Sequence, residues 1–378
     1  MKSIQLGMHW FPERAGGLDR VYYELCRYLP AAGVSVRGLL AGSGRAAEES
    51  GGSIRAFGAA DAPLLKRLRA VRQAIQAEVV DSSPDVLAAH FALYAFPALD
   101  IVSRHPFVMH FHGPWAREVA AEGGRHWVCR IQAMLERAVY GRADRLIVLS
   151  RAFGDILASQ YGIDESRIRI VPGGVDAARF DVALDRKGAR AQLGWDQDRP
   201  TVLVVRRLAR RMGLENLIEA ARHIVVKIPE VQILIAGKGP LAQELGARID
   251  ICGLQRSVKL LGFVSDEDLP LAYRAADLSV VPTVALEGFG LITLESLAAG
   301  TPVLVTPVGG LPEAVSGLSS SLVLPGSDVP SLVDGITAAL KGEMLLPEAS
   351  ACHAHVLLHH DWSVIAMKTR AVYEEAIG

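Results

Sequence analysis

The feature that most constrains the fold is a repeated alternation of short apolar runs, rich in Val, Ile and Leu, with longer segments of helical period. Such runs are typical of parallel sheets whose strands are joined by crossover helices. This alternation occurs twice along the chain. Strands are predicted near residues 4–8, 34–40, 86–90, 107–111 and 146–149, and again near 201–205, 231–236, 258–261, 278–281 and 302–306. The sequence therefore predicts an α/β protein with two Rossmann-like, doubly wound domains facing each other across a cleft.

The boundary between the two halves is indicated by chain breakers and charge. Helices are expected between the strands, near residues 19–29, 127–140, 214–227, 241–252 and 291–299. Pro172-Gly173-Gly174 and the polar run 181–200 interrupt this pattern. We therefore expect an N-terminal domain over residues 1–180 and a C-terminal domain over residues 181–360.

Charge and cysteine usage exclude several classes of protein. Lys and Arg number 40 against 41 Asp and Glu, a net charge of −1, which argues against a nucleic-acid binder that depends on a basic surface. The four cysteines lie about a hundred residues apart and the N-terminus lacks a signal-peptide pattern, so a cytoplasmic location is expected. The apolar segment 279–312 contains two carboxylates, which favours buried strand, loop and helix over a membrane span.

Two carboxylates eight positions apart form the most informative constellation, Glu287 and Glu295. Between them, Gly288 and Gly290 permit close approach of a ligand to the backbone, and the helix expected from Leu291 offers its N–H groups to a phosphate. Glu295 can then accept hydrogen bonds from vicinal hydroxyls such as those of a ribose. The alternative interpretation is a pair of structural carboxylates that cap the helix and a neighbouring loop.

Further candidate residues follow other predicted strands. Four arginines lie in the segment 206–211, directly after the strand 201–205, where a guanidinium can hold a diphosphate. Gly16-Gly17 separates the first strand from a helix, and His112 follows another strand. A solvated basic loop and a structural histidine are the alternatives for these segments.

Taken in order, these motifs resemble those of the retaining GT-B glycosyltransferases of glycosyltransferase family 4, also called glycosyl transferases group 1. The matching segments span nearly the whole chain: Gly16-Gly17 with Arg20, His112-Gly113, 143–150, 171–176 with Phe180, Arg207-Leu208, 237–240, 261–264, 276–278, 287–295 and the aromatic segment 362–373. The resemblance implies that a C-terminal helix, 361–378, joins the first domain.

The resemblance also implies roles for individual residues. It assigns catalytic roles to His112 beside the reacting sugar, Arg207 on the diphosphate and Glu287 on the sugar hydroxyls. The implied donor-binding residues are Gly16, Gly17, Arg211, Gly237, Phe263, Val264, Gly288, Phe289, Gly290, Leu291 and Glu295, the last on the ribose. A nucleotide sugar would be bound mainly by the second domain and an acceptor by the first. No metal and no cofactor beyond the nucleotide-sugar co-substrate is expected.

Two positions depart from the family pattern. Met212 stands where the family usually has a lysine, so a second cation for the diphosphate would have to come from Arg210 or Arg211. Gly173 stands where the family usually has asparagine, which we interpret as a hinge variation.

Other motifs in the sequence would suggest different kinds of site. Gly237 to Ala242 resembles a dinucleotide fingerprint but lacks the acidic residue that should end the next strand. The acidic runs 196–198 and 266–268 are expected to be solvated rather than metal-binding. Cys352, His355 and His359 have helical spacing that would suit zinc, although a histidine-rich helix is the preferred interpretation.

The expected function is transfer of a sugar, with retention, from a UDP- or GDP-sugar to an acceptor in cell-surface polysaccharide or glycolipid assembly. The alternatives are a small soluble natural-product acceptor, or a non-catalytic nucleotide-sugar-binding paralogue. The acceptor would be a glycan, a lipid-linked compound or a small molecule, and no nucleic-acid partner is expected. The basic amphipathic segment 64–75 suggests weak association with an anionic membrane at its inner face, and packing of its apolar stripe on the sheet is the alternative.

Overall fold

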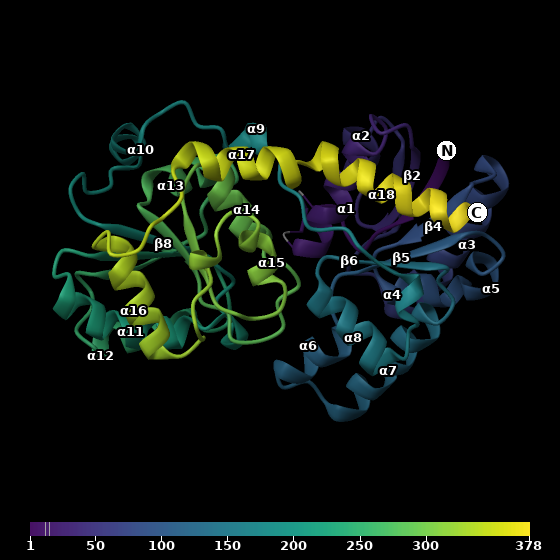
Figure 1. Cartoon of the computed structure of the whole chain (residues 1–378). Coiled ribbons are helices and arrows are strands. Elements are labelled where there is room, and N and C mark those ends of the chain that lie inside the picture. The colour runs from purple at the N-terminus through teal and green to yellow at the C-terminus, as the bar shows by residue number, and fades with distance from the viewer. Residues whose placement is uncertain (12, 15) are drawn as a thin grey trace. The chain divides into compact units, whose positions relative to one another are not determined.

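The computed structural model describes residues 1–11, 13–14 and 16–378, which divide into two compact units. The first unit comprises residues 1–173 and 362–378, and the second comprises residues 174–361 (Figure 1). The second unit begins earlier than the boundary expected after residue 180. Within it, Val175 N donates to the carbonyl of His360, and the amide of Ala177 donates to the Asp361 carboxylate, so this linker belongs to the second unit.

The first unit is built on a parallel sheet with the strand order β3-β2-β1-β4-β5-β6-β7. Its strands are β1 (Lys2–Leu6), β2 (Ser35–Ala41), β3 (Ile54–Gly58), β4 (Val86–Ala89), β5 (Phe107–Phe111), β6 (Arg145–Val148) and β7 (Ile168–Ile170). One row of the register runs across it as Leu39, Leu6, Ala89, Met109 and Leu146, all buried. This row forms the centre of the core on one face of the sheet.

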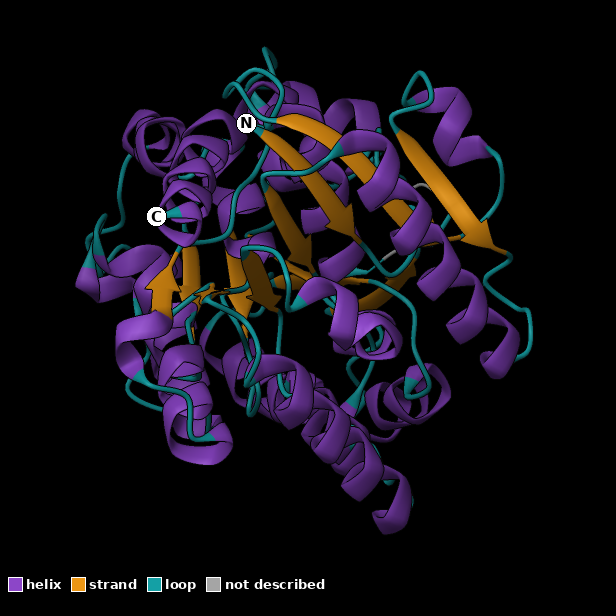
Figure 2. Cartoon of the chain, turned by 90° about the vertical axis from the view of Figure 1, so that its right-hand side faces the viewer, coloured by secondary structure: helices purple, strands orange, loops and turns teal. Residues whose placement is uncertain are grey.

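Helices cover both faces of this sheet (Figure 2). They are α1 (Gly17–Tyr28), α2 (Arg45–Glu49), α3 (Leu64–Ser82), α4 (Ala92–Ala95), α5 (Leu99–Val102), α6 (Trp115–Ala121), α7 (His126–Tyr140), α8 (Arg151–Tyr161) and α18 (Trp362–Ile377), with 3₁₀ helices η1 (Phe96–Ala98) and η2 (Glu165–Arg167). Side chains alternate along a strand, so Gln5 and His110 face away from the core row that holds Leu6 and Met109. On that other face Gln5 meets Tyr22 of α1 and Tyr373 of α18.

The second unit repeats the plan with five parallel strands in the order β10-β9-β8-β11-β12. These are β8 (Thr201–Val205), β9 (Gln232–Ala236), β10 (Val258–Gly262), β11 (Leu278–Val281) and β12 (Val303–Val305). The helices are α9 (Ala177–Phe180), α10 (Arg186–Leu193), α11 (Leu214–Lys227), α12 (Ala242–Ile251), α13 (Leu269–Ala275), α14 (Leu291–Ala298), α15 (Leu311–Ser316), α16 (Val329–Leu340) and α17 (Ala349–His359), with 3₁₀ helices η3 (Arg210–Met212) and η4 (Ser320–Leu322).

Helix α11 shows why the local sequence forms these elements. Leu214, Leu217, Ile218, Ala221 and Ile224 are buried and recur every three or four residues, so one face of the helix packs on the sheet. Gly213 precedes the helix with φ +72°, a conformation that favours glycine. The apolar spacing and the glycine together set where α11 begins and which face it buries.

The predicted α/β class with two Rossmann-like units is confirmed, and the differences concern the sheet edges and one helix. Strands β3 and β7, at the two edges of the first sheet, were not predicted, because both are short and partly exposed and each is interrupted by an arginine. In α3, Val71 and Ile75 pack into the core, whereas Leu64 and Leu65 of its first turn are exposed. The packing alternative therefore accounts for the centre of the segment 64–75, and its first turn alone presents apolar side chains to solvent.

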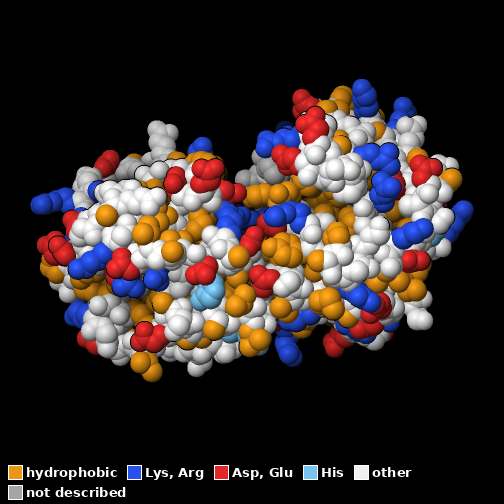
Figure 3. All heavy atoms as spheres, turned by 90° about the horizontal axis from the view of Figure 1, so that it is seen from above, with side chains coloured by type: hydrophobic (Ala, Val, Ile, Leu, Met, Phe, Trp, Pro, Cys, Tyr) orange, Lys and Arg blue, Asp and Glu red, His pale blue; other side chains and the backbone are white. Residues whose placement is uncertain are grey.

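The face seen in Figure 3 carries side chains of both charges in mixture, in keeping with the net charge of −1. Among the residues that the structure describes, no helix is both long and apolar enough to cross a membrane. The segment 279–312 consists of β11, a loop, α14, β12 and the start of α15.

Candidate functional site

The predicted residues of the second unit gather at the carboxyl edge of its sheet. Arg206 and Arg207 directly follow β8, Gly237 follows β9, Phe263 and Val264 follow β10, and the loop 282–290 connects β11 to α14. Parallel strands end at one edge, and β8 lies between β9 and β11, where the order of connections reverses. Open α/β sheets bind their ligands at such a switch point.

Arg206 forms a nearly buried ion pair with Glu287. Its Nη2 donates to the Glu287 carboxylate and to the hydroxyl of Thr283, and the two charged side chains are only 8% and 13% exposed. The Nε of Arg206 has no hydrogen-bond partner among the described residues. The sequence analysis assigned roles to Arg207 and Glu287 but missed Arg206, whose place directly after a buried strand was the available signal.

The remaining arginines of the segment 206–211 have different surroundings. Arg207 is exposed, and Arg210 is 69% exposed and pairs with Glu244 at 3.2 Å. Arg211 instead donates from Nη1 to the carbonyl of Leu286 at 2.7 Å, next to Glu287. Met212 is buried. Of the two arginines considered as substitutes for the family lysine, Arg211 is the one that contacts the loop containing Glu287.

Two glycines allow loops at this edge to approach each other's backbone. A Cβ on Gly237, whose φ is +147°, would lie 1.8 Å from the carbonyl oxygen of Arg206. A Cβ on Gly309 would lie 1.9 Å from the carbonyl oxygen of Glu287, to which the amide of Gly310 donates at 3.0 Å. Gly237, which the resemblance assigns to donor binding, thus has a clear packing role: a side chain there would displace Arg206.

Helix α14 places Glu295 inside the unit. Gly290 precedes the helix with φ +78°, and Gly288 and Leu291 flank the same turn. Glu295 is 4% exposed, and its carboxylate accepts a hydrogen bond of 3.2 Å from the hydroxyl of Tyr273.

The side chain of Phe289 is buried, with its ring 5.5 Å from that of His360. Any ligand contact of this residue would therefore involve its backbone, as the resemblance implies for Gly288, Phe289 and Gly290.

Phe263 and Lys238 form an exposed pair at the ends of β10 and β9. The Phe263 side chain is 63% exposed, and Lys238 Nζ lies 4.9 Å from the centre of its ring. Val264 lies beside them, partly buried. The sequence analysis named Phe263 and Val264 but not Lys238, which it treated as part of a weak glycine motif.

In the first unit, Gly16 and Gly17 lie at the amino end of α1. Gly16 is in an extended conformation, and its carbonyl accepts the amide of Arg20 at 2.9 Å. Asp19, in the first turn, is buried and accepts the amide of His9 at 2.9 Å. Asp19 therefore fixes the loop that follows β1 against the start of the helix.

His112 lies at the carboxyl edge of the first sheet, directly after β5, and is partly exposed. Its Nε2 is 3.1 Å from Nδ1 of His90, and the rings of His90 and His110 stack with centroids 4.1 Å apart. Burial lowers the pKa of His112 to about 4 and the pKa values of His90 and His110 well below the ordinary histidine range. The three imidazoles are therefore neutral at pH 7.

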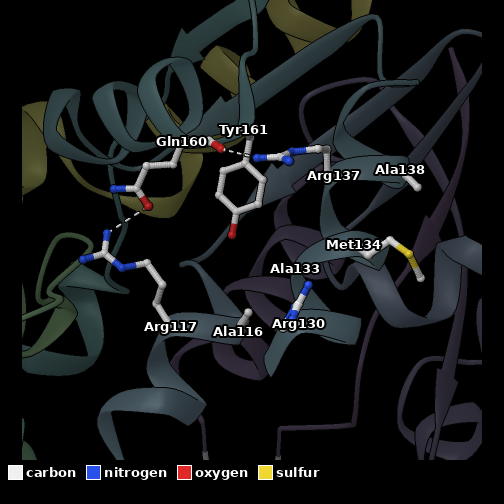
Figure 4. A pocket seen from close by; sticks show the side chains of 9 residues that line it. All are labelled: Ala116, Arg117, Arg130, Ala133, Met134, Arg137, Ala138, Gln160 and Tyr161. Carbon is white, nitrogen blue, oxygen red and sulfur yellow. Dashed lines mark hydrogen bonds between the residues drawn. The ribbon is translucent and has the colours of Figure 1, made fainter. Parts of the chain in front are cut away.

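Other candidates from the sequence lie apart from these residues. A cavity of about 530 Å³ between α6, α7 and α8 is lined by Arg117, Arg130, Arg137, Met134 and Tyr161, among others, and by none of the predicted site residues (Figure 4). Arg117 and Arg137 both donate to Gln160 there.

The sequence also offered candidate metal ligands. Asp196 accepts the backbone amides of Asp198 and Arg199, and Cys352 lies against the carbonyl of Pro347. Within the described part of the chain, no three His, Cys, Asp or Glu side chains are grouped as metal ligands.

Two Rossmann-like units with candidate residues at the carboxyl edges of their sheets are the architecture of the GT-B glycosyltransferases. Residues 15–179 match the model of Glycosyltransferase Family 4, and residues 185–353 match that of Glycosyl transferases group 1. The chain belongs to these glycosyltransferases, as the motifs of the sequence indicated.

Individual relatives agree with this assignment. A D-inositol 3-phosphate glycosyltransferase of Mycobacterium sp. (strain KMS) is 37% identical over 231 residues, which cover 59% of this chain and 51% of that protein. The matched region thus spans about half the length of this relative.

Sucrose-phosphate synthase from Thermosynechococcus elongatus superposes with a TM-score of 0.79 at 22% identity, covering 99% of this chain and 98% of that one. Anabaena HepE, solved with UDP and glucose, has a TM-score of 0.79 at 21% identity, covering 99% of this chain and 100% of that one. These two structures establish similarity of fold.

Proposed function

We propose that this chain is a retaining, metal-independent glycosyltransferase that moves a sugar from a nucleoside diphosphate sugar to an acceptor hydroxyl, in the assembly of a cell-surface polysaccharide or glycolipid. All four cysteines lie in the described part of the chain and none forms a disulfide, which supports a reducing, cytoplasmic location. The family establishes transfer of a sugar, and the finer assignments rest on the residues below.

The observation that carries the proposal is the charged cluster at the switch point of the second sheet. Glu287 has its charge balanced by buried Arg206, so its carboxylate can accept hydrogen bonds from sugar hydroxyls without leaving a charge uncompensated. Arg211, anchored on the adjacent carbonyl of Leu286, and exposed Arg207 supply positive charge at the same edge. This combination suits a nucleoside diphosphate sugar, which presents hydroxyls and two phosphates together.

The proposed chemistry is a substitution on one face of the sugar. The bond between C1 and the phosphate oxygen breaks, the acceptor oxygen bonds to C1, and the acceptor proton passes to the leaving phosphate. Negative charge grows on the diphosphate during this step, so placed arginines stabilise the transition state more than the ground state. Arg207 and Arg211 would have that role, while Glu287 orients the sugar and Glu295 binds the ribose.

The comparisons support a uridine nucleotide as the first donor to test. HepE was solved with UDP and glucose, and another of its structures contains UDP-glucose. The curated relatives named D-inositol 3-phosphate glycosyltransferase favour a second candidate, in which the acceptor is a small, highly hydroxylated molecule bearing a phosphate. A non-catalytic paralogue is the less favoured alternative, because Arg211 offers a cation where Met212 replaces the family lysine.

A thermal-shift series tests the proposal. The native chain is melted with UDP, GDP and ADP in the presence of EDTA, and then with the sugar conjugates of the nucleotide that binds. We expect UDP to raise the melting temperature, because a ligand that binds only the folded state stabilises it. Equal, negligible shifts for all three nucleotides would contradict a nucleotide-sugar site.

A further inference from the structure

A continuous chain of hydrogen bonds links the partly exposed imidazole of His112 to the interior of the first unit. His112 Nε2 lies 3.1 Å from His90 Nδ1, and His90 Nε2 lies 3.3 Å from the side-chain oxygen of Gln5. The Gln5 amide nitrogen donates to the hydroxyl oxygen of Ser3 at 3.1 Å, and that hydroxyl donates to the carbonyl of Ser35 at 3.3 Å. Every group in this chain of hydrogen bonds belongs to the first unit.

The direction of each hydrogen bond follows from its fixed end. A backbone carbonyl can only accept, so Ser3 donates to Ser35 and uses a lone pair to accept from the Gln5 nitrogen. This orients the amide, and its oxygen faces His90, which must donate from Nε2. Buried His90 is neutral and carries one proton, so its Nδ1 accepts. The hydrogen between the two imidazoles therefore belongs to His112 Nε2.

We propose that Ser3, Gln5 and His90 are positioning residues that hold His112 in its Nε2–H tautomer, so that Nδ1 is presented as a hydrogen-bond acceptor to a ligand hydroxyl. This inference deepens the proposed function, because a hydroxyl of the sugar or of the acceptor is the group that such a nitrogen would accept from. The part of the chain that the structure describes offers His112 Nδ1 no hydrogen-bond partner. A neutral acceptor at this position also disfavours a phosphate oxygen, which has no proton to donate.

Tyr373 of the C-terminal helix contacts Gln5, one member of the hydrogen-bond relay formed by His112, His90, Gln5 and Ser3. The hydroxyl of Tyr373 lies 2.9 Å from His110 Nε2, 3.1 Å from the Gln5 amide nitrogen and 3.2 Å from the Gln5 side-chain oxygen. Gln5 keeps its bond to Ser3 when this hydroxyl is removed. Tyr373→Phe therefore removes buried contacts of Gln5 and His110 but keeps the four hydrogen bonds of the relay, which makes it the control for loss of a buried hydrogen bond next to Gln5.

The test reads the tautomer directly by NMR, without substrate. The full-length chain is labelled with ¹⁵N-histidine, and the His112 signals are assigned by their loss in His112→Gln. Long-range ¹H–¹⁵N correlations then show which ring nitrogen carries the proton. We expect the proton on Nε2 in the native chain; a proton on Nδ1, or an equal mixture, overturns the proposal.

Variants test whether the relay causes this preference. Gln5→Leu removes the acceptor of His90, so we expect His112 to become a mixture of tautomers, whereas Tyr373→Phe keeps Nε2–H. Ser3→Ala removes the group that orients Gln5 and takes the place of Gln5→Leu if that variant does not fold. A pure Nε2–H tautomer in the folded relay variant would show that the relay is structural only.

Kinetics separate this inference from the proposed function. If the relay positions His112, the relay variant should lose turnover by about three- to tenfold, the range expected for one neutral hydrogen bond, with UDP affinity unchanged. Equal turnover in the native chain and the relay variant would overturn the positioning role. A native chain that shows the Nε2–H tautomer but no transfer from any nucleotide sugar would refute the proposed function instead.

Discussion

Two consecutive arginines illustrate how neighbouring residues take different roles. Arg206 is nearly buried against Glu287 and Thr283, whereas Arg207 is exposed. A buried charge that loses its partner is costly, while an exposed side chain contributes little to stability. The sequence shows four arginines in this segment and cannot show which one turns inward, because that depends on the loop arriving from β11.

The matched substitutions Arg206→Ala and Arg207→Ala should separate folding from catalysis. Arg206→Ala leaves Glu287 uncompensated and is expected to lower the free energy of unfolding by about 3 kcal/mol. Arg207→Ala should change it by less than about 0.5 kcal/mol and lower turnover at least about tenfold. Urea unfolding and donor turnover are the two measurements. Loss of stability in Arg207→Ala, with Arg206→Ala unaffected, would reverse the assignment.

Glu295 is expected to bind the nucleotide, in addition to accepting a hydrogen bond from Tyr273. Glu295→Ala is expected to weaken UDP binding by about 1–3 kcal/mol, because two ribose hydroxyls lose their acceptor. Tyr273→Phe removes the internal hydrogen bond at 3.2 Å and should change the affinity far less. Calorimetric titration of UDP into both variants decides between them. Equal losses would show that the carboxylate acts through Tyr273 alone.

At the scale of elements, the sequence predicted the buried strands and also β10 and β12, the edge strands of the second sheet, but missed β3 and β7, the edge strands of the first. Strands β5, β8 and β11 agree with their predicted bounds, because each is a β-branched or apolar run buried in the sheet. Strands β3 and β7 each contain an arginine as their second residue, Arg55 and Arg169, and their short sequences are also compatible with loops. Periodicity in a single sequence records burial, and β3 and β7 are only partly buried, whereas the edge strand β12 is fully buried.

The first turn of α3 is the part of the segment 64–75 that remains available for the predicted membrane contact. Arg67 donates to the hydroxyl of Tyr94 and Arg72 pairs with Asp100, whereas Lys66 and Arg69 are exposed near Leu64 and Leu65.

We therefore expect the double substitution Lys66→Gln and Arg69→Gln to weaken binding to anionic vesicles at low salt by about 1 kcal/mol per charge. The measurement is the fraction of protein that sediments with the vesicles. Arg72→Gln, the matched control, should leave that fraction unchanged. Equal effects of both variants would mean that the contact is not local to the first turn.

The buried histidines of the first sheet should make stability depend on pH. The pKa of His112 is lowered to about 4 in the folded chain, against about 6.5 when unfolded, so between these values the unfolded chain binds the extra proton. Stability is therefore full above pH 6.5 and falls as the pH approaches 4. His112→Gln removes one such site, and its melting temperature should fall less between pH 7 and pH 5 than that of the native chain. A steeper fall in the variant would contradict the lowered pKa.

At the scale of the whole molecule, the repeated alternation of strands and helices was sufficient to predict two Rossmann-like units and to place the candidate site residues at the carboxyl edges of their sheets. What it could not supply was contact between distant segments: Arg206 with Glu287, Arg211 with Leu286, and His112 with Gln5 through His90. Each of these joins segments that only the sheet order brings together. The sequence therefore did not predict the charge balance and the hydrogen bonding of the candidate site.

The proposed reaction needs no metal ion. The proposed stabilisation of the leaving diphosphate uses Arg207 and Arg211, so turnover in excess EDTA should match turnover with added Mn²⁺ to within about twofold. The measurement is the rate of UDP release from the donor sugar. An absolute requirement for Mn²⁺ would contradict the role given to the arginines.

The central claim is transfer with retention from a nucleoside diphosphate sugar, and a ¹H NMR time course of UDP-glucose with the native chain tests it most directly. The reaction is run in EDTA with a panel of hydroxyl acceptors and with water alone, and the first-formed anomer is read before mutarotation. The account predicts release of UDP together with an α-glucosyl product. A β-linked product, or no release of UDP from a folded chain with any nucleotide sugar, would contradict it.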